Sequence, residues 1–108
     1  MQIIKYHTLK INFTLLVFAL FFSWSSFSQI VNIPDANFKN VLVNFNVTDS
    51  NGDGSLNADV DINNDGEIQN SEALLISNLQ LPSFQNIISL AGLQSFTNLI
   101  TFSAVYNN

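Results

Sequence analysis

The chain has no cysteine and very few basic side chains. Its 108 residues include three Lys or Arg and one His, against eight Asp or Glu. Without cysteine the protein can form no disulfide and carry no lipid-modified cysteine. Small exported domains usually need a disulfide, a metal ion or further repeats for stability, so the absence of cysteine leaves the last two.

Only one long apolar run is present, and it lies near the N-terminus. Residues 11–22 are almost entirely apolar, basic side chains precede them, and a short polar stretch ends at Ser28. This order predicts a secretion signal over residues 1–28, cleaved between Ser28 and Gln29. The run is shorter than the roughly 20 residues of a membrane span, which argues against the alternative of an uncleaved anchor. We therefore expect a secreted or cell-surface protein with no transmembrane span after cleavage.

Removal of the signal changes the charge and the chemistry that remain. His7 and two of the three lysines leave with it, so Lys39 stands alone against eight acids, a net charge of −7. An acidic surface repels nucleic acid, whose binding depends on Lys and Arg, and it suits a cation. With neither His nor Cys left, a Ser–His or Cys–His nucleophile cannot form. We expect the protein not to be an enzyme.

Three zones of different composition follow the signal. Residues 29–47 predict an N-terminal cap helix that begins near Pro34, with Asp35 in its first turn. Residues 48–72 are rich in Asp, Asn and Gly, and residues 73–108 carry a regular apolar pattern. The buried face of the cap helix is predicted to consist of Phe38, Val41 and Leu42.

The second zone contains a 12-residue pattern typical of an EF-hand calcium loop, from Asp61 to Glu72. Calcium takes six to eight oxygens, and alternate residues of a curled loop supply them, with Gly66 allowing the sharp turn. Glu67 would contribute its carbonyl while its carboxylate faces solvent, and Gln69 would act through water. The predicted ligands are Asp61, Asn63, Asp65, Glu67, Gln69 and Glu72. The alternatives are ordinary Asn-Asp-Gly turns or a catalytic carboxylate pair, for which the sequence supplies no cleft.

The first half of the same pattern occurs 12 residues upstream, but Val60 occupies its twelfth position. The shared residues are Asp49, Asn51, Asp53 and Ser55. Closure could come from Asn57 and Asp59, or from Asp61 shared between two ions. The sequence leaves open whether one or two calcium ions bind. A ladder that mixes Asn with Asp indicates the weak affinity of extracellular sites, about 0.1–1 mM.

The third zone contains a 23-residue match. Ile76, Leu79, Leu81 and Phe84 align with Leu99, Phe102, Ala104 and Asn107. This spacing predicts short parallel strands at the start of a leucine-rich-repeat solenoid, with a 3₁₀-like return between them. The alternative is a pair of amphipathic segments in a small α+β domain. Because such solenoids need about three or more repeats, we expect the chain to be a fragment.

Residues 33–40, residues 61–73 and the apolar pattern ending at Asn107 together resemble the start of exported bacterial leucine-rich-repeat surface proteins of the internalin-like kind. The resemblance implies an α+β fold in which a capping helix and a calcium-type loop lead into the solenoid. It also implies a role in recognition or adhesion, with a surface protein or a glycan as the partner. The alternatives are a dockerin-like calcium module that docks a partner, or the N-terminal appendage of an exported enzyme.

Overall fold

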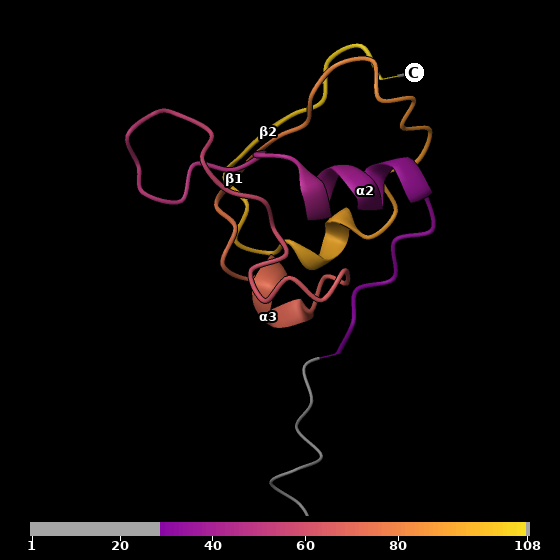
Figure 1. The fold of residues 1–108 in the computed structure, drawn as a ribbon, viewed down its shortest axis with the longest axis horizontal. Coiled ribbons are helices and arrows are strands. Elements are labelled where there is room, and N and C mark those ends of the chain that lie inside the picture. Colours follow the sequence, from indigo (N-terminus) through magenta and orange to yellow (C-terminus); the bar gives the residue numbers. More distant parts are fainter. Residues whose placement is uncertain (1–28, 108) are drawn as a thin grey trace, which may run out of the picture.

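The structure is a computed structural model that describes residues 29–107. The predicted signal over residues 1–28 lies outside the described residues. The elements are the helices α2 (Ala36–Asn44) and α3 (Asn70–Ala73), the strands β1 (Asn78–Gln80) and β2 (Thr101–Ser103), and the 3₁₀ helix η1 (Leu93–Ser95) (Figure 1). Within the described range, none of these helices combines the length and the apolar character that crossing a membrane requires.

Helix α2 forms because its apolar residues recur at helical spacing behind a good N-cap. Asp35 is that cap and not a first-turn residue as the sequence predicts, since its Oδ1 accepts hydrogen bonds from the main-chain N–H groups of Asn37 and Phe38, at 2.9 Å each. The side chains of Phe38, Val41 and Leu42 are fully buried. The helix therefore packs by the face that the sequence predicts.

The strands β1 and β2 form a two-stranded parallel sheet. Leu79 pairs with Phe102 in its register, and the N–H of Leu81 continues the contact by donating to the carbonyl of Ser103 at 2.8 Å. On the other side of β1, the N–H of Gln80 donates to the carbonyl of Val47 at 2.8 Å. Strand β1 thus lies between β2 and the segment that follows α2.

The prediction of a leucine-rich-repeat solenoid is wrong. Residues 29–107 contain one sheet of two three-residue strands, and no repeat architecture is seen among them. In a solenoid, equivalent positions of successive repeats enter one continuous core. Here Leu79 is 2% exposed, whereas its partner Phe102 is 39% exposed. The apolar residues are regularly spaced, but they are not equally buried. The segment predicted to return between the strands contains only the short 3₁₀ helix η1.

A single hydrophobic core gathers side chains from every zone of the described chain. Its members are Val31, Ile33, Phe38, Val41, Leu42, Val47, Val60, Ile68, Ala73, Ile76, Leu79, Leu81, Ile87 and Phe96. The segment between Thr48 and Ala58 projects from this core as a loop closed by an antiparallel bridge between those two residues (Figure 1). The loop 61–72 contributes Ile68 to this core, and its last three residues form most of α3.

Candidate metal centre

The first half of the loop 61–72 is shaped by its own carboxylates. Oδ2 of Asp61 accepts the N–H of Gly66 at 2.8 Å, and its Oδ1 accepts the N–H of Asp65 at 3.2 Å. Oδ1 of Asp65 in turn accepts the N–H of Glu67 at 2.9 Å. The backbone of Gly66 has a φ of 81°, which a residue with a side chain rarely adopts. These bonds curl the chain around Asp61, whose side chain is only 2% exposed.

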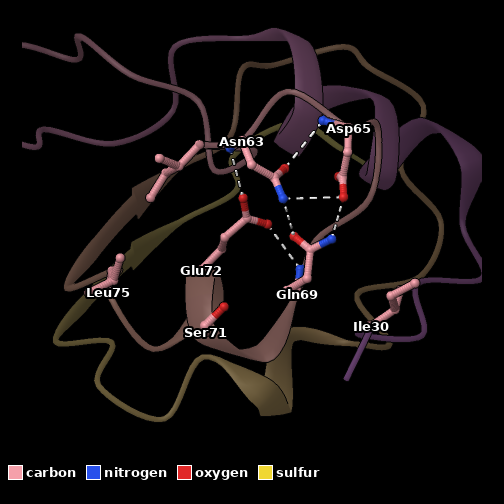
Figure 2. Close-up of a pocket in the computed structure, with 8 residues that line it drawn as sticks. Ile30, Asn63, Asp65, Gln69, Ser71, Glu72 and Leu75 are labelled. Carbon is pink, nitrogen blue, oxygen red and sulfur yellow. Dashed lines mark hydrogen bonds between the residues drawn. The ribbon is translucent and has the colours of Figure 1, made fainter. Parts of the chain in front are cut away.

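Glu72 closes the loop from the short helix α3. Its Oε1 accepts the N–H of Asn63 at 3.1 Å and its Oε2 accepts the N–H of Gln69 at 3.0 Å (Figure 2). Glu72 is 6% exposed, so both its oxygens are held inside the loop. Asp61 and Glu72, the predicted ligands at the two ends of the loop, are therefore both buried carboxylates.

The side chains between these two ends also converge. Figure 2 shows the side-chain amides of Asn63 and Gln69 directed at the carboxylate of Asp65, and both donate hydrogen bonds to its Oδ2. The main-chain N–H of Glu67, followed by these amides, keeps the pKa of Asp65 below its usual range. Asp65 therefore remains ionised to lower pH than an ordinary aspartate.

Glu67 differs from the prediction. Its carboxylate does not simply face solvent, because Oε2 lies 2.7 Å from Nζ of Lys39 on α2. The two side chains are 40% and 34% exposed, respectively. Lys39 is a contact of the loop that the sequence reading missed, and no local signal marks it because the partners are 28 residues apart.

A pocket opens beside the loop. Polar side chains of the loop and of α3 line one part of it, and the exposed apolar side chains of Ile30 and Leu75 flank them (Figure 2). The exposed side chain of Ile62 belongs to the same lining. The polar lining residues are Asn63, Asp65, Gln69, Ser71 and Glu72. Four of these five are predicted ligands, so the pocket leads from solvent to the candidate site.

The upstream loop repeats the geometry of the first half. Oδ2 of Asp49 accepts the N–H of Gly54 at 2.7 Å, and Oδ1 of Asp53 accepts the N–H of Ser55 at 2.9 Å. Oδ1 of Asn51 accepts the N–H of Asp53 at 3.2 Å, as that of Asn63 accepts the N–H of Asp65. The bond from Gly54 is the main cause that lowers the pKa of Asp49. The two half-patterns in the sequence are thus two half-loops of one shape.

The second half of the upstream loop is different. Val60, at the twelfth position, is fully buried in the core. Oδ1 of Asn57 accepts bonds from the N–H and the hydroxyl of Ser50, at 2.9 and 3.0 Å, and so closes the projecting loop. Asp59 is half-buried, and this burial, followed by the nearby charge of Asp61, raises its pKa. Asp61 itself is hydrogen-bonded within the downstream loop, so only that loop has a complete set of candidate ligands.

Asn78 is the second residue that the sequence reading missed. Its Oδ1 accepts the N–H of Asp49 at 2.7 Å and the hydroxyl of Thr48 at 3.2 Å, while its Nδ2 donates to the carbonyl of Asp49 at 3.0 Å. The amide thereby ties β1 to the start of the upstream loop. The only feature of the sequence that could have indicated this role is the position of a polar asparagine inside an apolar pattern.

Two further findings bear on this site. Within residues 29–107, no three or more His, Cys, Asp or Glu side chains are grouped as a metal ion would need. The candidate loop instead combines carboxylates with the side-chain amides of Asn63 and Gln69, and calcium accepts such a mixed set of oxygens. Comparison of the chain with protein-family models, with curated proteins and with solved structures finds no match in any of the three.

Proposed function

We propose that this chain is an exported, non-catalytic protein that binds one calcium ion through the loop 61–72. The ion has a structural role: it neutralises the carboxylates of the loop and so stabilises the packing of the loop against the rest of the fold. The predicted signal supports the export, and extracellular calcium at millimolar concentration suits a site of modest affinity.

The observation that carries this proposal is the burial of Asp61 and Glu72 without a basic partner. Among residues 29–107 the one ion pair joins Lys39 to Glu67, and neither buried carboxylate takes part in it. Main-chain N–H groups satisfy their hydrogen bonds but cancel no net charge. Two buried carboxylates without a counter-charge are costly, and a divalent cation between them would remove that cost.

The proposed stoichiometry is one ion. The upstream loop has the same first half, yet Val60 replaces the closing carboxylate and Asn57 is engaged with Ser50. The lost second half removes the bidentate ligand that completes a calcium shell.

The partner of the protein is a separate question. A role on a concave repeat surface no longer has a structural basis, because the solenoid is absent from the described residues. A dockerin-like module would need an amphipathic helix after Glu72, but α3 ends at Ala73. A surface protein that contacts the apolar rim of Ile30, Ile62 and Leu75 is the form of recognition that the pocket favours.

Calorimetric titration of the purified chain with calcium tests the proposal. We expect one ion per chain with a dissociation constant on the order of 0.1–1 mM, and a rise in the unfolding temperature at saturation. Asp61→Asn combined with Glu72→Gln removes both buried charges and should abolish the heat. Glu67→Gln is the matched control, because its carboxylate bonds Lys39 and only its carbonyl is a candidate ligand, so it should still bind.

Two results would contradict the proposal. The first is the absence of both binding heat and thermal stabilisation at several millimolar calcium. The second is unchanged binding in the double variant, which would place the ion elsewhere in the chain.

A further inference from the structure

The segment Gln29–Ile33 lies along the second half of the calcium loop. The N–H of Val31 donates to the carbonyl of Ile68 at 2.8 Å, and the N–H of Asn70 donates to the carbonyl of Gln29 at 2.7 Å. Between these two bonds, Ile30 and Gln69 form an antiparallel bridge. The segment therefore contacts three consecutive loop residues through its main chain.

The segment is also anchored on its other side. Val31 and Ile33 are 5% and 8% exposed and belong to the core. Gly92, which precedes η1, lies against Asn32 and Ile33: a Cβ atom at that position would stand 2.8 Å from Cγ1 of Ile33 and 2.9 Å from the carbonyl oxygen of Asn32. Its φ of 107° independently requires glycine. Gly92 thus leaves the space through which the segment passes.

We infer that Gln29–Ile33 is the positioning element of the ion site, an inference that rests on the proposed calcium function. The first half of the loop is shaped internally by Asp61 and Asp65, whereas the second half has external support. Residues 68–70 lead straight into α3, which carries Glu72, and Glu72 accepts the N–H of Gln69. Main-chain bonds from the segment to residues 68–70 hold Glu72 where its two oxygens can close the ion shell.

The coupling between segment and ion runs in both directions. A preorganised loop binds more tightly because less freedom is lost on binding. By thermodynamic reciprocity, calcium that fixes Glu72 and residues 68–70 must strengthen the docking of the segment by the same factor. Removal of the segment's bonds should therefore lower affinity although no ligand is altered.

Two substitutions outside the loop test this inference. Val31→Pro deletes the N–H that donates to Ile68, and Gly92→Ala displaces Ile33 and Asn32 from their path. Each should weaken calcium binding by about tenfold in calorimetric titration, the size expected from one lost hydrogen bond and lost preorganisation. Asn44→Ala is the control, because Asn44 is exposed on α2, bonds Asn40 and contributes to neither the segment nor the loop. It should bind calcium nearly as the unaltered chain does.

Hydrogen exchange of the unaltered chain gives a readout that does not depend on any variant. Calcium should slow exchange of the Val31 and Asn70 amides, while the Lys39 amide inside α2 serves as reference. Unchanged exchange at both amides on calcium binding would overturn the inference. So would unchanged calcium affinity in Val31→Pro and Gly92→Ala. Absence of binding by the unaltered chain would instead overturn the proposed function itself.

Discussion

Nζ of Lys39 lies 2.7 Å from Oε2 of Glu67, and this ion pair joins helix α2 to the loop 61–72. Lys39 is the only basic residue after residue 28. Both side chains are about a third exposed or more, so water and salt screen their attraction. The pair therefore orients the loop relative to the helix more than it stabilises the fold.

Substitution Lys39→Met should accordingly lower the free energy of unfolding by less than about 1 kcal/mol, as for other exposed pairs. Urea unfolding in the presence of EDTA measures this without the ion. Glu67→Gln should give a similar loss, and the double variant should add little because the same pair is removed. Fully additive losses would show that the two side chains act independently.

Asp35 should make the stability depend on pH through a long-range contact. Its Oδ2 accepts the N–H groups of Ile88 and Ser89, while Oδ1 caps α2. The cap bond from Phe38, followed by those from Ser89 and Ile88, lowers the pKa from its ordinary value of 3.8. A lowered folded-state pKa contributes stability above 3.8, and this contribution is lost as pH falls through the folded value.

Asp35→Asn keeps an oxygen for the cap but replaces an acceptor of the Ile88 and Ser89 bonds with an amide that donates. The unfolding temperature should fall at pH 7, and the difference from the unaltered chain should shrink below about pH 4. Asp53→Asn is the control, since the hydrogen bonds of Asp53 stay within its own loop. A difference for Asp35→Asn that stays constant down to pH 3 would contradict this account.

The two paired residues of the sheet should differ in their importance. Leu79 is 2% exposed and Phe102 is 39% exposed. Leu79→Ala should cost about 2–5 kcal/mol of unfolding free energy because it leaves a cavity, whereas Phe102→Ala should cost less than about 1.5 kcal/mol. Urea unfolding compares them directly. Equal losses would mean that Phe102 is buried in solution.

Asn78→Ala should destabilise the attachment of the upstream loop. The substitution removes the partners of both the N–H and the carbonyl of Asp49 and that of the Thr48 hydroxyl. We expect a loss of about 1–3 kcal/mol in thermal or urea unfolding, since these groups are partly buried. Asn44→Ala is the comparison, because Asn44 bonds only Asn40 on the exposed face of α2. A change below about 0.5 kcal/mol for Asn78→Ala would refute the role given to this amide.

Features that depend on near neighbours in the chain could be predicted. The apolar spacing of Phe38, Val41 and Leu42 places them on one helical face, and all three are fully buried. The hydrogen bonds from Gly66 to Asp61 and from Gly54 to Asp49 each span five residues. Both partners therefore lie within one short sequence pattern. Whether the downstream loop binds calcium remains a prediction.

Features that depend on distant residues could not be predicted. Glu67 is 28 residues from Lys39, Asn78 is 29 from Asp49, and Asp35 is 53 from Ile88. The prediction of a solenoid is wrong for a related reason. A 23-residue spacing shows that two segments have similar sequences, but it does not show that both are buried in one core. Leu79 is buried and Phe102 is not, and only packing decides between them.

The sequence by itself determined the acidic charge, the shape of both half-loops and the face by which α2 packs, because each follows from residue type and short-range geometry. The tertiary structure alone decided that Lys39 pairs with Glu67 and that Asn78 holds the upstream loop. It alone brought Gln29–Ile33 past Gly92 and onto residues 68–70 of the loop 61–72. These contacts join segments far apart in the chain, and their formation depends on how one small core is filled.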